Sequence, residues 1–282
     1  MNYTSIADLA NTIRRNLWKI PQDVALIVGV PRSGLMAALI LGEMLHKPVQ
    51  SLWEFIEGWT PCAGGRGKHL HRISGRTLVL DDTCYSGRTM QKVQHQLLTA
   101  GVEGVLYGCI YAEGANAKQY VDIWLEDNYN PREELWHLYE WNILHHGAKL
   151  STCTMWDLDG VLCKEPPNEQ DVTAYEQYIA NAIPMIQPTT RLGAICTYRR
   201  EQYRETTEQW LRSVGVTYER LIMRTNKAAR SIDDAIRYKA TYYGDATWAR
   251  LFVESSARQA KAIHEITHKQ VYCYENGIMY GN

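Results

Sequence analysis

The chain has 282 residues, of which 45% are hydrophobic and 22% are charged. This is ordinary globular composition, which excludes a largely disordered chain, and the length favours two domains over one. Its 30 basic and 31 acidic side chains give a formal net charge of −1, so the chain lacks the cationic surface of a general nucleic-acid-binding protein. The seven scattered cysteines, with no CxxC pair, indicate a reduced cytoplasmic protein without structural zinc, and no apolar run is long enough to span a membrane.

The N-terminal half alternates between strand and helix patterns. Apolar, β-branched runs predict strands at 24–30, 77–80 and 104–111, and helical patterns cover 35–45 and 90–98. Such alternation predicts a parallel sheet, in which ligands bind beyond the carboxyl ends of the strands. Residues 31–34 and 82–89 follow two of those ends, so we expect them to form binding loops.

Two adjacent carboxylates, Asp81 and Asp82, end the second of these strands, and a loop with the hydroxyls of Ser86 and Thr89 follows. Carboxylates accept hydrogen bonds from the vicinal hydroxyls of a ribose or hold Mg²⁺. Hydroxyls and backbone N–H groups ahead of a helix bind phosphate. The same residues could also form an Asx-type helix cap with one spare carboxylate.

The string LVLDDTCYSGRT (78–89) resembles the phosphoribosyl-diphosphate (PRPP) binding motif of type I phosphoribosyltransferases, from which it departs at Thr83 and Tyr85. The resemblance implies that Asp81 and Asp82 face the ribose hydroxyls. It also implies a loop that holds the 5′-phosphate, made of Thr83, Cys84, Tyr85, Ser86, Gly87, Arg88 and Thr89. The string GVPRSG (29–34) matches the family's pyrophosphate loop, which implies a diphosphate site at Arg32, Ser33 and Gly34.

Two further parts of that family have matching stretches here. Residues 58–72 correspond to the mobile lid, in which Arg66 and Lys68 would bind PRPP; a plain solvated loop is the alternative. The base-binding hood would lie near residues 134–146, where Trp141 would stack on a nucleobase and Asn142 would read its edge. Core packing of a strand with alternating aromatic residues is the alternative for that stretch.

The strand and helix pattern restarts near residue 151. Strands are predicted at 152–156, 191–196, 220–223, 251–253 and 270–274, with helices over 201–214 and 257–268. The expected fold class is therefore α/β, with two successive Rossmann-like parallel-sheet domains at 1–150 and 151–282.

The string TCTMWDLDGVLC (152–163) resembles the first motif of the haloacid dehalogenase (HAD) superfamily. The resemblance implies a capless HAD-like phosphatase, in which Asp157 attacks a phosphoryl group and Asp159 protonates the leaving oxygen. An acidic turn after a strand is the plain alternative.

Other HAD motifs are partly present. Thr197, with Arg199 nearby, would bind the phosphoryl oxygens, and Lys239 would neutralise charge, with Lys227 as its rival. Mg²⁺ would be held by Asp157, the Asp159 carbonyl and Glu254. Ser255 stands where the superfamily usually has a second acid, which leaves a binding-only domain as an alternative.

Together the two resemblances imply a bifunctional enzyme of nucleotide metabolism. It would transfer phosphoribosyl from PRPP to a nucleobase-like acceptor and remove a phosphate by an aspartyl-phosphate mechanism. A nucleotide- or PRPP-sensing protein with silent domains is one alternative. A polynucleotide-end phosphatase is another, disfavoured by the near-zero net charge. The expected partners are PRPP and a nucleobase or nucleotide, with no membrane and no nucleic acid, and the sequence is compatible with a homodimer.

Overall fold

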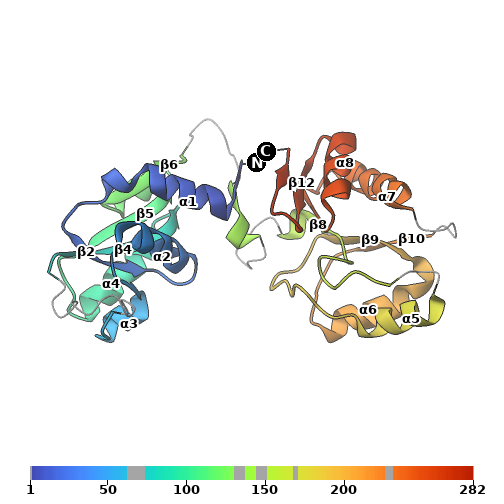
Figure 1. Cartoon of the computed structure of the whole chain (residues 1–282), viewed down its shortest axis with the longest axis horizontal. Helices are drawn as coiled ribbons and strands as arrows, with labels where there is room; N and C mark the ends of the chain where they lie inside the picture. The colour runs from blue at the N-terminus through green and yellow to red at the C-terminus, as the bar shows by residue number, and fades with distance from the viewer. Residues whose placement is uncertain are drawn as a thin grey trace. The chain divides into compact units, whose positions relative to one another are not determined.

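The chain forms two compact units, residues 6–136 and residues 1–5 together with 137–282 (Figure 1). The structure is a computed structural model that describes residues 2–61, 74–129, 137–143, 151–167, 171–225 and 231–281. The boundary expected from the sequence lies at residue 150. The units divide at residue 136 instead, because β1 (Asn2–Thr4) pairs in parallel with β7 (His137–Tyr139) and both belong to the C-terminal unit.

The N-terminal unit is built on a five-stranded sheet with the order β3-β2-β4-β5-β6. All of its strand pairs are parallel, which confirms the predicted α/β class for this half. The strands are β2 (Val24–Gly29), β3 (Val49–Ser51), β4 (Arg76–Cys84), β5 (Leu106–Ala112) and β6 (Ile123–Asp127). The helices are α1 (Ile6–Arg15), α2 (Ser33–Leu45), α3 (Leu52–Ile56) and α4 (Arg88–Thr99), with the 3₁₀ turns η1 (Leu17–Lys19) and η2 (Ala117–Gln119).

Apolar runs become central strands here because helices cover both faces of the sheet. Leu26 and Val28 of β2 belong to the core cluster that includes Met90, Val93 and Leu97 of α4, and all five are buried. Helix α3 begins at a capping box, in which Ser51 accepts from the backbone N–H of Glu54 and Glu54 accepts from that of Ser51.

The strand order of this unit reverses between β2 and β4. From β2 the chain passes to β3 on one side, then crosses back to β4 and continues outward to β5 and β6. In open α/β sheets, ligands bind beyond the carboxyl ends of the strands at such a point. The two predicted binding loops follow those two strands.

The C-terminal unit has a six-stranded sheet with the order β10-β9-β8-β11-β12-β13. The pairs from β10 to β12 are parallel, as the α/β prediction requires, whereas β13 is an antiparallel edge strand that was not predicted. The strands are β8 (Thr154–Trp156), β9 (Ala194–Arg200), β10 (Leu221–Arg224), β11 (Leu251–Glu254), β12 (Gln270–Cys273) and β13 (Met279–Tyr280). The helices are α5 (Val172–Asn181), α6 (Arg204–Ser213), α7 (Ile232–Asp245) and α8 (Ala257–Thr267), with η3 (Glu140–Asn142), η4 (Ser151–Cys153) and η5 (Glu201–Tyr203).

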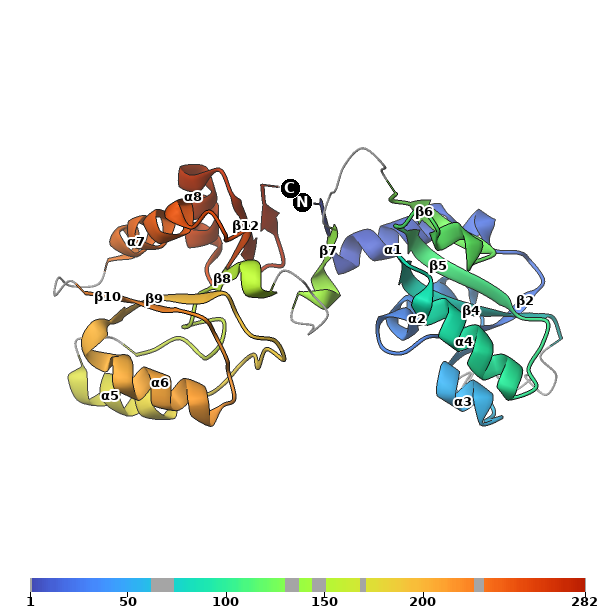
Figure 2. The same ribbon diagram turned by 180° about the vertical axis from the view of Figure 1, so that it is seen from behind.

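The two pairs of helices cover opposite faces of this second sheet, as Figure 2 shows. Met155 of β8 is buried in the cluster that contains Tyr243 of α7 and Ile263 of α8. The next residue, Trp156, is buried in the cluster that contains Trp210 of α6. The strand order reverses between β8 and β11, so the expected ligand position lies at their carboxyl ends.

Among the residues that the structure describes, no helix has the length and apolar character needed to cross a membrane.

Candidate active sites

The loop after β2 and the end of β4 meet closely in the N-terminal unit. The backbone N–H of Val30 donates to the carbonyl oxygen of Leu80 (2.9 Å). A Cβ atom added at Gly34 would lie 2.6 Å from Oδ1 of Asp81 and 2.9 Å from its Cα. Glycine is therefore required at position 34 if this loop is to approach the buried acid.

Replacing Gly34 by Ala should destabilise the protein by about 1–3 kcal/mol, because the added methyl group overlaps Asp81 and the backbone of β4. Gly244 of α7 is the matched control, since a Cβ there would meet only Cγ2 of Thr267 at 3.8 Å. Gly244→Ala should leave stability unchanged or raise it by about 0.5–1 kcal/mol. Urea unfolding of both variants checks the pair, and equal effects would contradict the close approach.

Asp81 and Asp82 are both buried near the end of β4, which extends beyond the predicted strand to Cys84. The backbone N–H of Asp82 donates to Oδ1 of Asp81 (3.0 Å). Burial raises the pKa of Asp81 well above its usual value, and the negative charge of Asp82 adds to the effect. Two buried adjacent carboxylates are stabilised by hydroxyl donors or a cation.

A pocket of about 140 Å³ lies beside these acids, lined by Asp81 and by residues 83–90. Gly87 caps the N-terminus of α4 with a φ of +72°, and its missing side chain leaves space for the ring of Tyr120. The helix N-terminus and the exposed Ser86, Arg88 and Thr89 offer donors to an anion.

The other predicted residues of this loop have different surroundings. Thr83 is half-buried and Tyr85 is exposed. Cys84 is buried, with Sγ 3.6 Å from the carbonyl oxygen of Ala117, and burial raises the pKa of its thiol. A thiol held in this way adds no charge to the pocket.

The remaining PRPP residues lie in two places. Arg32 is exposed and Ser33 half-buried at the start of α2, ahead of Gly34. Arg66 and Lys68 of the predicted lid lie outside the described residues, and PRPP binding by them stays a prediction.

Only part of the predicted hood, which spans residues 134–146, lies within the described residues. Trp141 and Asn142 lie in η3 of the C-terminal unit, where the ring of Trp141 is 4.9 Å from that of Tyr139. Residues 134–136 and 144–146 lie outside the described part of the chain. The structure does not bring Trp141 and Asn142 into the compact unit that holds Asp81, and base binding by them stays a prediction.

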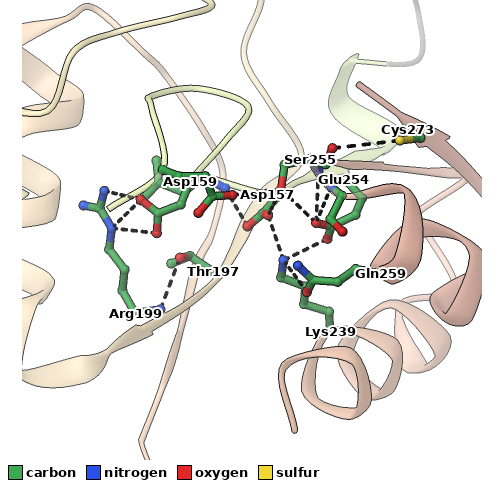
Figure 3. A network of polar contacts seen from close by, with 12 residues as sticks. Asp157, Asp159, Thr197, Arg199, Lys239, Glu254, Ser255, Gln259 and Cys273 are labelled. Atoms are coloured by element: carbon green, nitrogen blue, oxygen red, sulfur yellow. Dashed lines mark hydrogen bonds and ion pairs between the residues drawn. The ribbon is translucent and has the colours of Figure 1, made fainter. Parts of the chain in front are cut away.

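In the C-terminal unit, three charged residues meet at the carboxyl ends of the two central strands (Figure 3). Asp157 follows β8, Glu254 ends the neighbouring β11, and Lys239 comes from α7. Nζ of Lys239 donates to Oδ2 of Asp157 (2.7 Å) and to Oε2 of Glu254 (2.8 Å). All three side chains are buried. The structure thus brings Lys239 to this site, and Lys227 lies outside the described residues.

The charges of this cluster do not balance. Burial raises the pKa of Asp157 well above its usual value, and the negative charge of Glu254 raises it further. Burial alone would lower the pKa of Lys239, but the charges of Asp157 and Glu254 outweigh burial and raise it. With both acids ionised, two carboxylates share one ammonium group, which leaves one negative charge inside the protein.

Asp159 is turned toward Arg199 rather than toward Lys239 (Figure 3). Nη2 of Arg199 lies 2.6 Å from Oδ1 of Asp159, and Nε lies 3.1 Å from both carboxylate oxygens. This ion pair is buried. A group that donates a proton must first be neutral, and pairing with a guanidinium stabilises the charged carboxylate instead. The predicted role of Asp159 as an acid therefore requires this pair to open.

Thr197 is fully buried on β9, two residues before Arg199. Its Oγ1 accepts a hydrogen bond from the backbone N–H of Arg199 (3.2 Å). Because residues two apart on a strand point to the same face of the sheet, the T-x-R spacing places Thr197 and Arg199 on one face of β9.

The site offers two of the carboxylates that Mg²⁺ could use, but no larger set of ligands among the described residues. In the described part of the chain, no three Asp, Glu, His or Cys side chains gather closely enough to hold a metal ion. The carboxylate of Asp159 is taken up by Arg199, so only its carbonyl could serve as the predicted ligand. Mg²⁺ usually needs only one or two carboxylates and completes its shell with water. Asp157 and Glu254 provide two, together with the unbalanced negative charge.

Fold and site together define an α/β protein with a candidate ligand site at the switch point of each sheet. No protein-family model matches the chain, and no curated protein matches its sequence. Similar solved structures include the purine phosphoribosyltransferase of Pyrococcus horikoshii, with 19% identity, a TM-score of 0.36 and coverage of 50% of this chain and 92% of that one.

Two further structures are similar to a comparable degree. The xanthine-guanine-hypoxanthine phosphoribosyltransferase of Helicobacter pylori shows 16% identity and a TM-score of 0.36 over 50% of this chain and 93% of that one. A chain of a Pnkp1/Rnl/Hen1 complex shows 11% identity and a TM-score of 0.35 over 96% of this chain and 94% of that one. Similarities this low carry no functional inference, which rests on the geometry of the two sites.

Proposed function

We propose that the N-terminal unit binds PRPP and transfers its phosphoribosyl group to a nucleobase-like acceptor. The observation that carries this proposal is the meeting of Gly34 with Asp81 at the switch point of the sheet, beside a phosphate-sized loop at the start of α4. A diphosphate, a ribose and a 5′-phosphate need three adjacent groups of partners. The loop after β2, the acids of β4 and residues 83–89 offer such a set.

The proposed reaction breaks the bond between C1 of the ribose and the diphosphate oxygen, and both electrons leave with the diphosphate. A ring nitrogen of the acceptor then forms the new bond to C1 and loses its proton to water. Arg32 stabilises the departing charge. Asp81 and Asp82 accept hydrogen bonds from the ribose hydroxyls and favour its positive character in the transition state. The chemistry is therefore mainly positioning and electrostatics.

Binding of PRPP tests this proposal directly. Asp81→Asn combined with Asp82→Asn should weaken Mg²⁺-dependent PRPP binding at least about tenfold, or about 1.4 kcal/mol. Calorimetry on the full chain measures the effect, with Glu103→Gln as a control that removes an exposed charge elsewhere in the unit. If the double variant is folded and binds PRPP as the wild type does, the assignment is wrong.

We also propose that the C-terminal unit removes a phosphate from a nucleotide, a role supported by the buried cluster of Asp157, Lys239 and Glu254. An oxygen of Asp157 attacks the phosphorus, and the bond to the leaving oxygen breaks with uptake of a proton. Water then hydrolyses the aspartyl phosphate and releases inorganic phosphate. Lys239 holds Asp157 in place, and Thr197 binds phosphoryl oxygens. Mg²⁺, when bound by Asp157 and Glu254, would offset negative charge on the phosphoryl group.

A nucleotide formed by the first reaction is a chemically suitable substrate for the second, and its dephosphorylation would draw the reversible transfer forward. A PRPP- or nucleotide-sensing protein remains the alternative from a different class. It would bind these ligands without turnover, so mass analysis of products after incubation with PRPP, Mg²⁺ and a panel of bases separates the two. The net charge of −1 disfavours a polynucleotide-end phosphatase.

A further inference from the structure

The buried ammonium group of Lys239 has three N–H donors and no acceptor. Two of these donors are used by Asp157 and Glu254. The third acceptor is Gln259, whose Oε1 lies 3.4 Å from Nζ of Lys239 (Figure 3). Asp157 follows β8, Glu254 ends β11 and Gln259 lies in the first turn of α8. Acceptors from three separate elements therefore fix the direction of this ammonium group.

Gln259 reaches Lys239 because helices α7 and α8 pack against each other. Ala240 of α7 and Ala260 of α8 are buried in one apolar cluster. These two alanines directly follow Lys239 and Gln259, so the packing of the helices holds the two polar side chains beside each other. No motif marks Gln259 in the sequence, because it lies five residues after Glu254 and beyond the strand end.

The side chain of Gln259 is a neutral acceptor. Since the ammonium group only donates, the amide turns its oxygen toward Lys239. This contact satisfies the third N–H without adding a negative charge, whereas a carboxylate at the same place would be the third to share one lysine. A nucleotide phosphate is an anion, so a neutral acceptor orients the lysine without repelling the substrate.

We propose that Gln259 is a positioning residue of the phosphatase site, which orients Lys239 and through it the carboxylate of Asp157. This inference rests on the phosphatase function proposed for the C-terminal unit. Oδ1 of Asp157 accepts from the backbone N–H of Leu158 (2.9 Å), so Lys239 at Oδ2 completes the fixation of this carboxylate. Without Gln259 the ammonium group could shift between the two acids, and small misplacements of a reacting group slow a reaction.

Steady-state phosphate release from the common ribonucleoside 5′-monophosphates, measured on the full chain at saturating Mg²⁺, tests the inference. Gln259→Met keeps the length of the side chain and removes the accepting oxygen. Its kcat should fall about tenfold, the order of effect of one hydrogen bond to a charged group, while KM changes less than about twofold.

Two further variants separate positioning from packing. Gln259→Glu returns an accepting oxygen, so kcat should recover to within about threefold of the wild type, whereas KM should rise about tenfold because the added charge repels the phosphate. Gln209→Met makes the same change as Gln259→Met on the exposed surface of α6, and it should alter neither constant. Melting temperatures show that each variant is folded.

The results that would overturn the inference also distinguish it from the proposed function. If the wild type releases phosphate by a route that Asp157→Asn abolishes, and Gln259→Met leaves kcat unchanged, the role of Gln259 alone is rejected. An equal fall of kcat in Gln259→Met and Gln259→Glu would mean that the side chain acts by packing, which rejects the role as well. Absence of any Asp157-dependent phosphate release in the wild type would reject the phosphatase together with this inference.

Discussion

Asp157→Asn should lower phosphate release from a nucleoside 5′-phosphate by at least about three orders of magnitude, because it removes the proposed nucleophile and an amide cannot replace it. The substitution keeps the shape of the side chain. It also leaves Lys239 facing one carboxylate, Glu254, so the buried charges balance. We therefore expect activity to disappear while the melting temperature is maintained or raised. Phosphate release and thermal unfolding, measured on the same preparations, check both parts.

The comparison requires a magnesium titration, because Ser255 stands where a second acid would strengthen metal binding. Asp245→Asn, at the exposed end of α7, is the control and should retain full activity. Ser255→Asp should lower the Mg²⁺ concentration that the wild type needs. Equal, slow phosphate release by the wild type and Asp157→Asn at saturating Mg²⁺ would show that the C-terminal unit is not a phosphatase. The sensing role would then be favoured.

Substitution of Asp159 should change both the activity and the stability of the protein. Asp159→Asn removes the predicted proton donor, so phosphate release should nearly vanish. It also removes the charge that balances the buried guanidinium of Arg199. Breaking a buried pair on one side commonly costs about 3–5 kcal/mol, so this variant loses activity and stability together. Only a variant that remains folded under the assay conditions reports on catalysis.

The parts of both sites that follow strand ends could be predicted from the sequence. Asp81, Asp82 and Asp157 each come after a short apolar run, and carboxyl ends of parallel strands meet at one edge of a sheet. Helical periodicity also supports Lys239 as the lysine that neutralises charge at this site. It lies on the same buried stripe of α7 as Ala235, Ile236 and Tyr243, which makes it the lysine that points into the protein.

Contacts between distant segments could not be predicted in this way. Strand β1 pairs with β7, so Tyr3 lies beside Leu138 although the two residues are far apart in the sequence. Strands of three residues are too short to show a period of two, so the sequence pattern does not reveal them. Glu165 lies outside every motif, yet its Oε1 is 3.3 Å from Oγ of Ser255. Gly160 of the DxDG string leaves the space, and hydrogen bonds of Lys164 with Tyr178 and Ile183, which belong to no motif, hold the chain there. The unit boundary differs from the predicted one for the same reason, since it is set by where the chain packs.

Lys239→Met should destabilise the protein by about 3–5 kcal/mol at neutral pH, because it leaves Asp157 and Glu254 buried without a counter-charge. Methionine retains much of the length of lysine, so the loss is electrostatic rather than a cavity effect. Lys261→Met is the matched control. Lys261 forms an exposed i,i+4 pair with Glu265, which contributes about 0–1 kcal/mol.

The pH dependence distinguishes this electrostatic cost from a packing defect. Burial already raises the pKa of Asp157 in the folded protein above the value of about 3.8 that it has when unfolded. Removing the ammonium group raises it further. A folded state that binds the proton more tightly than the unfolded chain loses stability as the pH rises and regains it as the pH falls. The difference between wild type and Lys239→Met, measured by urea unfolding, should therefore be smaller at pH 5 than at pH 7. A cost that stays the same at both pH values would mean that Lys239 acts by packing, and that the excess negative charge assigned to this cluster is absent.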